Sequence, residues 1–454
     1  MATTRFNDAL RRAAQAVHEP RLPQDWLVRV VRDVYGRVRF AIDCDAQQYP
    51  PEARKLLETT LSNLGGYATK GEIIFRDDLS NPDLIFKSPD WHLTTVSGGF
   101  DDEDQAKPDL TVCVLDRQIM GQDWLNPITE PAPHPHRIVF FGLKGGVGRS
   151  TALAMVAYGL AREGKRVLLL DFDLESPGLS GLLLPPDRVA EFGLVDWFVE
   201  DAVGQGESVL RNLVSTSPLA DTTTGSIRVA AAMGQGESAY LSKLARVYAD
   251  IPGRDGRQGV QRFATRVQLV TQLLEAQEKP DVVLIDSRAG LHDVAAISIT
   301  SLADTALLFA TDSAQNWQGY AQLFAHWQHR PTVCAQVRER LAIVQALAPK
   351  SDREGRSKAF LNHAYELFSS SLYDEMPPPA INPVQLTMQS MMDLYNPAME
   401  DEAAPHYPIR VDWDEVFQEF DPKVRPEQGG VSDAEIDAKF GALISWVKSR
   451  ASGT

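Results

Sequence analysis

Residues 142–151 read GLKGGVGRST and combine the residue types that hold phosphate groups. The three glycines after the lysine let the backbone curl so that successive N–H groups point at phosphate oxygens. The stretch STALAMVAYGLA then predicts a helix whose N-terminal dipole faces the same anion. Ser150 is placed to offer its hydroxyl to Mg²⁺, and Thr151 would lie in the first helical turn, close to a phosphate.

The loop departs from the usual G-x-x-x-x-G-K-[ST] pattern at two positions. Leu143 occupies the first glycine position, and Arg149 stands where a lysine normally clamps phosphate. Arginine keeps the positive charge but is planar and forked, so the exchange is not conservative at a tight site. Its fork could instead bridge two phosphate oxygens. The loop alone is compatible with a working nucleotide site, a decayed one, or a plain glycine-rich turn.

Carboxylates follow two other apolar runs. Asp171 and Asp173 end RVLLLDFD, and Asp286 ends DVVLID. One of the first two carboxylates can face a metal ion, and a carboxylate beside the last phosphate could position or activate water. Asp286 lies where an acidic residue holds the water shell of the metal, and Gly290 could sense the last phosphate through its N–H. Ordinary helix capping is the alternative for Asp286.

Near-continuous apolar runs recur after residue 137 and predict buried strands. They are RIVFFG, RVLLLDFD, SIRVAAA, DVVLID, TALLFAT and LAIVQAL. Helical segments and glycine-bearing turns separate them, which is typical of a doubly wound α/β fold with a mostly parallel sheet. Ligands bind at the carboxyl ends of the strands in such folds. The loop and the aspartates all follow strands, so we expect them to share one edge of the sheet.

The residues before this region predict a separate small α+β domain over 1–125. WLVRVVRDVYGRVRFAIDCD is typical of two strands joined by a turn, and PPEARKLLETTLSNLGG of a helix that begins with proline. The proline-rich segment NPITEPAPHPHR, residues 126–137, predicts an extended linker. A nucleotide-binding P-loop domain over 138–450 follows.

Composition excludes several classes of protein. The chain has 454 residues, which favours two domains, and a formal net charge of −16, which argues against a broad surface that coats nucleic acid. Cys44, Cys113 and Cys334 form no C-x-x-C pair, which argues against a cysteine-based metal site and suits a reducing compartment. The sequence shows no secretory signal and no apolar run that would cross a bilayer. We therefore expect a cytoplasmic protein.

The ordered motifs resemble those of the deviant-Walker ATPases of the SIMIBI class, which are related to ParA, MinD and the arsenical-pump ATPase. KGGVGRST is similar to that family's K-G-G-x-G-K-[ST] loop, with its signature lysine at Lys144. Asp171 and Asp173 match its D-x-D motif, and DSRAG, residues 286–290, matches its D-[ST]-x-x-G motif. The resemblance covers roughly residues 137–350 and indicates a variant sub-branch with a KGGVGR loop.

The resemblance implies a homodimer that forms around ATP and Mg²⁺. Lys144 would reach into the partner's site, and Asp173 would activate water. Such proteins act as slow switches that control a partner protein, and we expect residues 1–125 to receive that partner. Gln345 stands where the family often has an Asn-Arg pair, and its amide could read the edge of adenine.

The sequence therefore predicts three sets of site residues. The catalytic set is Asp173, Lys144 and Arg149, and the metal set is Ser150, Asp171 and Asp286. The nucleotide-binding set is Gly145, Gly146, Val147, Gly148, Arg149, Ser150, Thr151, Gly290 and Gln345.

Three functions stay open on the sequence alone. The first is a slow or partner-dependent MgATPase switch, which analogy places in bacterial multi-gene systems such as conflict or defence systems. The second is a nucleotide-binding scaffold in which Arg149 locks a static complex without hydrolysis. The third is a DNA- or membrane-positioning ATPase, against which the acidic charge speaks. Residues 432–450 carry an apolar face at helical spacing, but the first half of this segment is acidic and anionic lipid would repel it. The segment therefore favours a docked core helix over a membrane helix.

Overall fold

The chain forms two compact units, which are described separately. The computed structural model describes residues 4–68, 73–88, 90–99, 105–126, 133–235, 239–253, 260–375, 394–417, 420–421, 424 and 430–451. Unit 1 comprises Met1–Gln122 and His326–Pro331, and unit 2 comprises Asp123–Ala325 and Thr332–Thr454. The domain limits drawn from the sequence stay predictions. Of the expected linker, residues 127–132 lie outside the described residues, and His136 already begins a strand.

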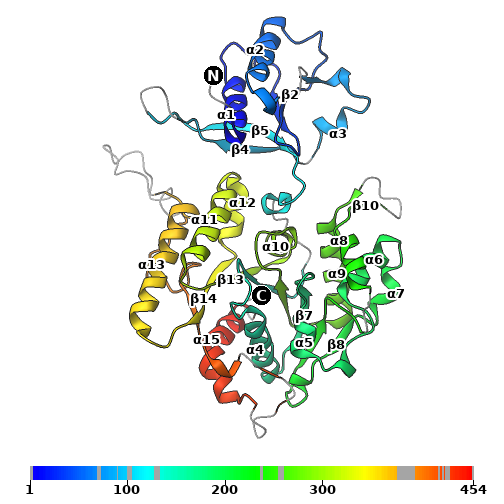
Figure 1. The fold of residues 1–454 in the computed structure, drawn as a ribbon, viewed down its shortest axis with the longest axis vertical. Helices are drawn as coiled ribbons and strands as arrows, with labels where there is room; N and C mark the ends of the chain where they lie inside the picture. Colours follow the sequence, from blue (N-terminus) through cyan, green and yellow to red (C-terminus); the bar gives the residue numbers. More distant parts are fainter. Residues whose placement is uncertain are drawn as a thin grey trace. The chain divides into compact units, whose positions relative to one another are not determined.

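Unit 1 is an α+β domain built on a five-stranded sheet (Figure 1). Its elements are α1 (Phe6–Val17), β1 (Val28–Arg32), β2 (Val38–Ile42), α2 (Pro51–Ser62), β3 (Ile74–Phe75), α3 (Asp83–Phe86), β4 (His92–Val96) and β5 (Leu110–Asp116). The strand order is β3-β2-β1-β5-β4, with β1 antiparallel to β2 and parallel to β5. Alternate strand residues such as Val30 and Phe40 pack with Ala13 of α1 and Leu57 of α2. The predicted strand pair and the helix that begins at proline are confirmed.

Unit 2 is an α/β domain with an eight-stranded sheet (Figure 1). Its strands are β6 (His136–Gly142), β7 (Arg166–Phe172), β8 (Val214–Thr216), β9 (Ser226–Ala230), β12 (Val282–Ser287), β13 (Thr305–Ala310), β14 (Leu341–Ala348) and β15 (Ile409–Asp412). They lie in the order β15-β14-β13-β6-β12-β7-β9-β8, and every neighbouring pair is parallel except β8 with β9. The predicted mostly parallel sheet is confirmed. Strands β10 (Ile251–Pro252) and β11 (Val260–Gln261) form a separate antiparallel pair.

Helices cover both faces of this large sheet. The helices described between residues 149 and 451 are α4 (Arg149–Arg162), α5 (Leu179–Leu183), α6 (Leu194–Ala202), α7 (Gly206–Leu210), α8 (Tyr240–Val247), α9 (Phe263–Glu278), α10 (Asp293–Ile297), α11 (Ala314–Gln328), α12 (Pro331–Arg338), α13 (Arg353–Ser371) and α15 (Asp433–Ala451). Phe140 of β6 belongs to the core under α4 and α15, whereas its neighbour Phe141 packs on Tyr320 of α11. Because successive strand residues point to opposite faces, burial on both sides requires the continuous apolar runs seen in the sequence.

The C-terminal helix α15 lies against α4 and is part of the core. The apolar face that the sequence indicated is buried, and it consists of Ile436, Phe440, Leu443, Ile444 and Val447. Arg162 of α4 forms an ion pair with Asp437 of α15, and the Tyr158 hydroxyl donates to Asp433 at 2.8 Å. The expected docked core helix is therefore confirmed. In the part of the chain that the structure describes, no helix is long and apolar enough to cross a membrane.

Two helical glycines at this contact give a matched test of the packing. A Cβ added to Gly159 of α4 would lie 2.8 Å from two carbons of Ile444, whereas one added to Gly441 of α15 would meet no atom within 4 Å. We expect Gly159→Ala to lower the free energy of unfolding by about 1–3 kcal/mol through overpacking against a stiff β-branched side chain. Gly441→Ala should raise it by about 0.5–1 kcal/mol, because alanine favours the helix. Urea denaturation of both variants measures this, and equal effects would contradict the contact.

Candidate functional site

The loop between β6 and α4 has the shape of an anion cradle. Gly146 and Gly148 have φ of 76° and 75°, the left-handed region that favours glycine. A Cβ on Gly145 or Gly146 would meet no described atom within 4 Å, so that side of the loop is open. Val147 is 6% exposed and anchors the loop in the core. The helix α4 begins directly after the loop, so its first N–H groups face the same opening.

Arg149, the first residue of α4, joins the loop to carboxylates from two other strands. Its Nε donates to Oδ1 of Asp286 at 2.7 Å, and its Nη2 donates to Oδ2 of Asp173 at 2.9 Å. The hydroxyl of Ser150 donates to the second oxygen of Asp286 at 2.6 Å. Four of the predicted site residues therefore meet at the carboxyl edge of the sheet, at the ends of β7 and β12 and the start of α4.

Burial and charge act in opposite directions on these groups. Burial disfavours the charge of Arg149, but Asp286 and Asp173 outweigh it and raise the pKa of the guanidinium. Burial raises the pKa of Asp173, although Arg149 partly opposes this. Removing one partner from a buried pair of this kind typically costs about 3–5 kcal/mol, because the other charge is left without compensation. The three side chains therefore depend on one another.

Asp171 uses both of its carboxylate oxygens within the chain. The backbone N–H groups of Asp173 and Leu179 donate to them at 3.2 and 3.1 Å. The side chain is fully buried, and this burial, together with the charge of Asp286, raises its pKa well above the usual range. Asp171 thus closes the loop that carries Asp173. Its predicted role as a direct metal ligand stays a prediction, and a metal would have to displace these bonds.

The remaining predicted residues lie in different surroundings. Lys144 is exposed and forms no ion pair with any described residue, and Thr151 is half-buried in the first turn of α4. The N–H of Gly290 donates to the carbonyl of Gly142 at 3.0 Å, so phosphate contact there would require that bond to open. Gln345 is 2% exposed in β14, and its Oε1 has no hydrogen-bond partner among the described residues. Contacts of these four residues with nucleotide stay predictions.

One cluster beside the site was missed by sequence reasoning. Glu175, two residues after Asp173, contacts Arg288 and the hydroxyl of Tyr248. The only available signal was a carboxylate close to the D-x-D motif, and its partners stand far away in the sequence without a motif of their own.

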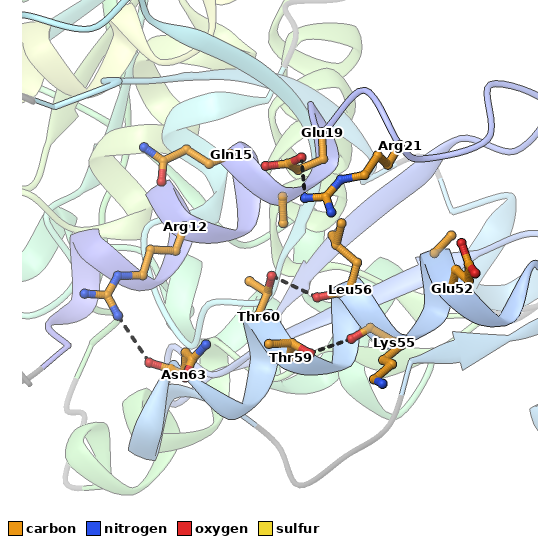
Figure 2. Close-up of a pocket in the computed structure, with 12 residues that line it drawn as sticks. Arg12, Gln15, Glu19, Arg21, Glu52, Lys55, Leu56, Thr59, Thr60 and Asn63 are labelled. Atoms are coloured by element: carbon orange, nitrogen blue, oxygen red, sulfur yellow. Dashed lines mark hydrogen bonds and ion pairs between the residues drawn. The ribbon is translucent and has the colours of Figure 1, made fainter.

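A separate groove lies in unit 1 between α1 and α2, as Figure 2 shows. Its volume is about 1050 Å³. Arg12, Gln15 and Glu19 line one side, and Lys55, Thr59 and Asn63 line the other. Its charged side chains include both signs, and Arg12 donates to the carbonyl of Asn63 at 3.2 Å. None of the predicted site residues lies in this groove.

Comparison with known proteins agrees with a nucleotide-binding domain. Residues 138–360 match the CbiA family, described as the CobQ/CobB/MinD/ParA nucleotide binding domain. The match supports a domain of this type within unit 2. No curated protein matches the chain.

Comparison with solved structures also found matches at low sequence identity. A ParA family ATPase from Chlorobium tepidum TLS is 16% identical, over 70% of this chain and 96% of that chain, with a TM-score of 0.37. MinD cell division protein of Aquifex aeolicus is 14% identical, over 69% and 97% of the two chains, with a TM-score of 0.37. Cobyrinic acid a,c-diamide synthase of Mycobacterium smegmatis, with bound ATP analog and magnesium, is 17% identical over 54% and 86%, with a TM-score of 0.36.

The raised pKa of Asp171 predicts a particular dependence of stability on pH. The folded chain holds this proton more tightly than the unfolded chain, so the contribution is greatest below the usual value of about 4 and declines as pH rises. The unfolding free energy of Asp171→Asn, minus that of the unmodified protein, should therefore increase from about pH 4 upward. Urea denaturation across pH gives this difference.

Asp281 provides the control with the opposite sign. Its carboxylate bonds Arg166, which lowers its pKa, so its contribution is lost as pH falls below about 4. The difference for Asp281→Asn should decrease with rising pH in that acidic window. Parallel pH profiles for Asp171→Asn and the unmodified protein would contradict the buried, proton-holding state of Asp171.

Proposed function

We propose that unit 2 binds ATP with Mg²⁺ at residues 142–151 and acts as a slow, nucleotide-gated switch. The observation that carries the proposal is the joining of Arg149 and Ser150 to Asp173 and Asp286 beside an open, glycine-lined loop. The match of residues 138–360 to the CobQ/CobB/MinD/ParA domain supports it. ATP rather than another nucleotide is inferred from the resemblance to ATPases.

The residues present fit both a polyphosphate and a metal ion. The backbone of Gly145 and Gly146 leaves room for phosphate oxygens, and the N-terminus of α4 faces them. Ser150 and Asp286, already in contact at 2.6 Å, would hold Mg²⁺ and its water shell. Bound Mg²⁺ would neutralise charge on the phosphate oxygens. Asp286 would keep the hydroxyl of Ser150 oriented with or without the metal ion.

Arg149 would control whether Asp173 is free to bind water. In the structure its guanidinium pairs with Asp173, the carboxylate that we assign to water. Phosphate oxygens are strong acceptors for arginine and would compete with Asp173 for Nη2. Once released, Asp173 can accept a hydrogen bond from a water and orient it toward the last phosphate. Binding of ATP would thus free the group that hydrolyses it.

We further propose that the ATP-bound state is a homodimer and that residues 1–125 receive a partner protein. The exposure of Lys144 supports the first part, because an exposed lysine in the loop can reach a second subunit. Its charge would then compensate phosphate from the partner's site.

A nucleotide-binding scaffold without hydrolysis is the second candidate. The contact between Arg149 and Asp173 favours it, since a carboxylate that stays paired cannot activate water. The two functions differ only in whether nucleotide breaks this contact.

The variant Asp173→Ala separates binding from hydrolysis. It should tighten MgATP binding, because Arg149 loses a competing carboxylate, and slow phosphate release by about 10²-fold or more, as loss of a general base does. Titration calorimetry and a phosphate-release assay measure the two effects, with Asp281→Ala at an exposed ion pair as the control.

Three outcomes of that experiment are decisive. If neither ATP nor GTP binds the unmodified protein, both candidate functions fail. If ATP binds but no phosphate is released, even with partners present, the scaffold is correct. If Asp173→Ala releases phosphate as fast as the control, Asp173 has no role in hydrolysis.

Lys144→Ala tests the proposed dimer. We expect it to bind ATP as a monomer and to lose dimerisation with ATP, because the cation that reaches the second site is gone. Light scattering after size exclusion, with and without MgATP, measures the mass. Lys358→Ala, at an exposed lysine of α13, is the control and should dimerise normally. Equal dimerisation of both variants would contradict the role of Lys144.

A further inference from the structure

Two loops lie beside the site. One carries the residue predicted to activate water, and the other carries the residue predicted to contact the last phosphate. The first, residues 173–178, follows β7 and begins with Asp173. The second, residues 288–292, follows β12 and contains Gly290. In the proposed function, Asp173 of the first loop and Gly290 of the second must be in place at the same time during hydrolysis.

Glu175 connects these loops directly. Its Oε1 forms an ion pair with Nη1 of Arg288 and lies 3.7 Å from Nε2 of His292, so it contacts residues on both sides of Gly290. Glu175 itself is two residues from Asp173. The carboxylate of Glu175 therefore links the first loop to two side chains of the second.

Residues at both ends of the helix α8 bond the loop that carries Glu175. The hydroxyl of Tyr240, its first residue, donates to the carbonyl of Leu174 at 2.6 Å. The hydroxyl of Tyr248, directly after its last residue, donates to Oε1 of Glu175. The residues on either side of the Leu174–Glu175 bond are thus fixed, and the Glu175 side chain is the point where α8 and both loops meet.

The ion pair between Glu175 and Arg288 is largely shielded from solvent. The side chains of Glu175 and Arg288 are only 22% and 29% exposed. Oε2 of Glu175 is buried and has no hydrogen-bond partner among the described residues, so this carboxylate depends on the contacts of Oε1. Loss of its charge would leave Arg288 partly buried and uncompensated.

We propose that Glu175 is a positioning residue that makes the loops 173–178 and 288–292 respond to nucleotide as one body. The inference rests on the proposed nucleotide switch and adds to it. Release of Asp173 from Arg149 would be coupled through Glu175 and Arg288 to movement around Gly290. Nucleotide binding through the loop 142–151 does not need this coupling, whereas alignment of Asp173 with the last phosphate does.

The test compares Glu175→Gln with a matched control, Glu278→Gln. Glu278 pairs with Arg228 at 2.7 Å, and their side chains are 10% and 32% exposed, so the control removes a similar carboxylate outside the two loops. For Glu175→Gln we expect kcat of phosphate release to fall about tenfold or more with Kd for MgATP changed less than about threefold, because a misplacement of about 1 Å can cost about 10²-fold in rate. Glu278→Gln should change neither.

Arg288→Ala and the double variant show whether the two residues act through each other. The double variant Glu175→Gln/Arg288→Ala should be no slower than either single variant, since the same connection is already lost. Multiplying effects would overturn the coupling. Unchanged kcat in Glu175→Gln would overturn the positioning role.

Hydrogen exchange keeps the inference testable in a protein that binds ATP without hydrolysing it. In the unmodified protein and in Glu278→Gln, MgATP should slow amide exchange in both 173–178 and 288–292. In Glu175→Gln only one of the loops should respond. A joint response in Glu175→Gln would refute the inference and leave the proposed function standing, whereas absence of ATP binding to the unmodified protein would refute both.

Discussion

The fork of Arg149 holds two carboxylates together at the carboxyl edge of the sheet. Asp173 directly follows β7 and Asp286 lies in the neighbouring strand β12, and their charges would repel one another without a cation between them. Arg149 supplies that cation from the first turn of α4 and is 7% exposed. A lysine ammonium also has several donors, but the planar fork of arginine fixes the directions of its bonds to the two carboxylates. The substitution that looked like decay therefore has a structural use.

The rest of unit 2 positions this fork. The parallel register of β12 with β7 places Asp286 beside Asp171, whose two oxygens fix the loop that carries Asp173. The helix α4 is in turn held by α15, because Ile444 packs on Gly159. Glu175 and α8 hold the same loop from its other side. Helices α15 and α8 thus help to position the site residues, although they lie outside the loop 142–151.

Much of this arrangement could be predicted from the sequence, for physical reasons. Short continuous apolar runs are typical of strands in a sheet buried on both faces, and parallel strands bring Ser150 and Asp286 to one edge. The apolar face of α15 was visible at helical spacing. The contact of Arg149 with Asp173 was not predictable, because it depends on a side-chain rotamer and on competition between carboxylates. The backbone bonds of Asp171 and the partners of Glu175 were likewise hidden, since Tyr248 and Arg288 belong to segments that carry no motif for this role.

Determination of the structure with and without a non-hydrolysable ATP analogue and Mg²⁺ tests the central claim most directly. Without nucleotide, the account predicts Nη2 of Arg149 within hydrogen-bond distance of Asp173. With the analogue bound, Arg149 should contact phosphate oxygens, and Asp173 should be free to bond a water. An analogue bound at residues 142–151 with the contact between Arg149 and Asp173 intact would contradict the account.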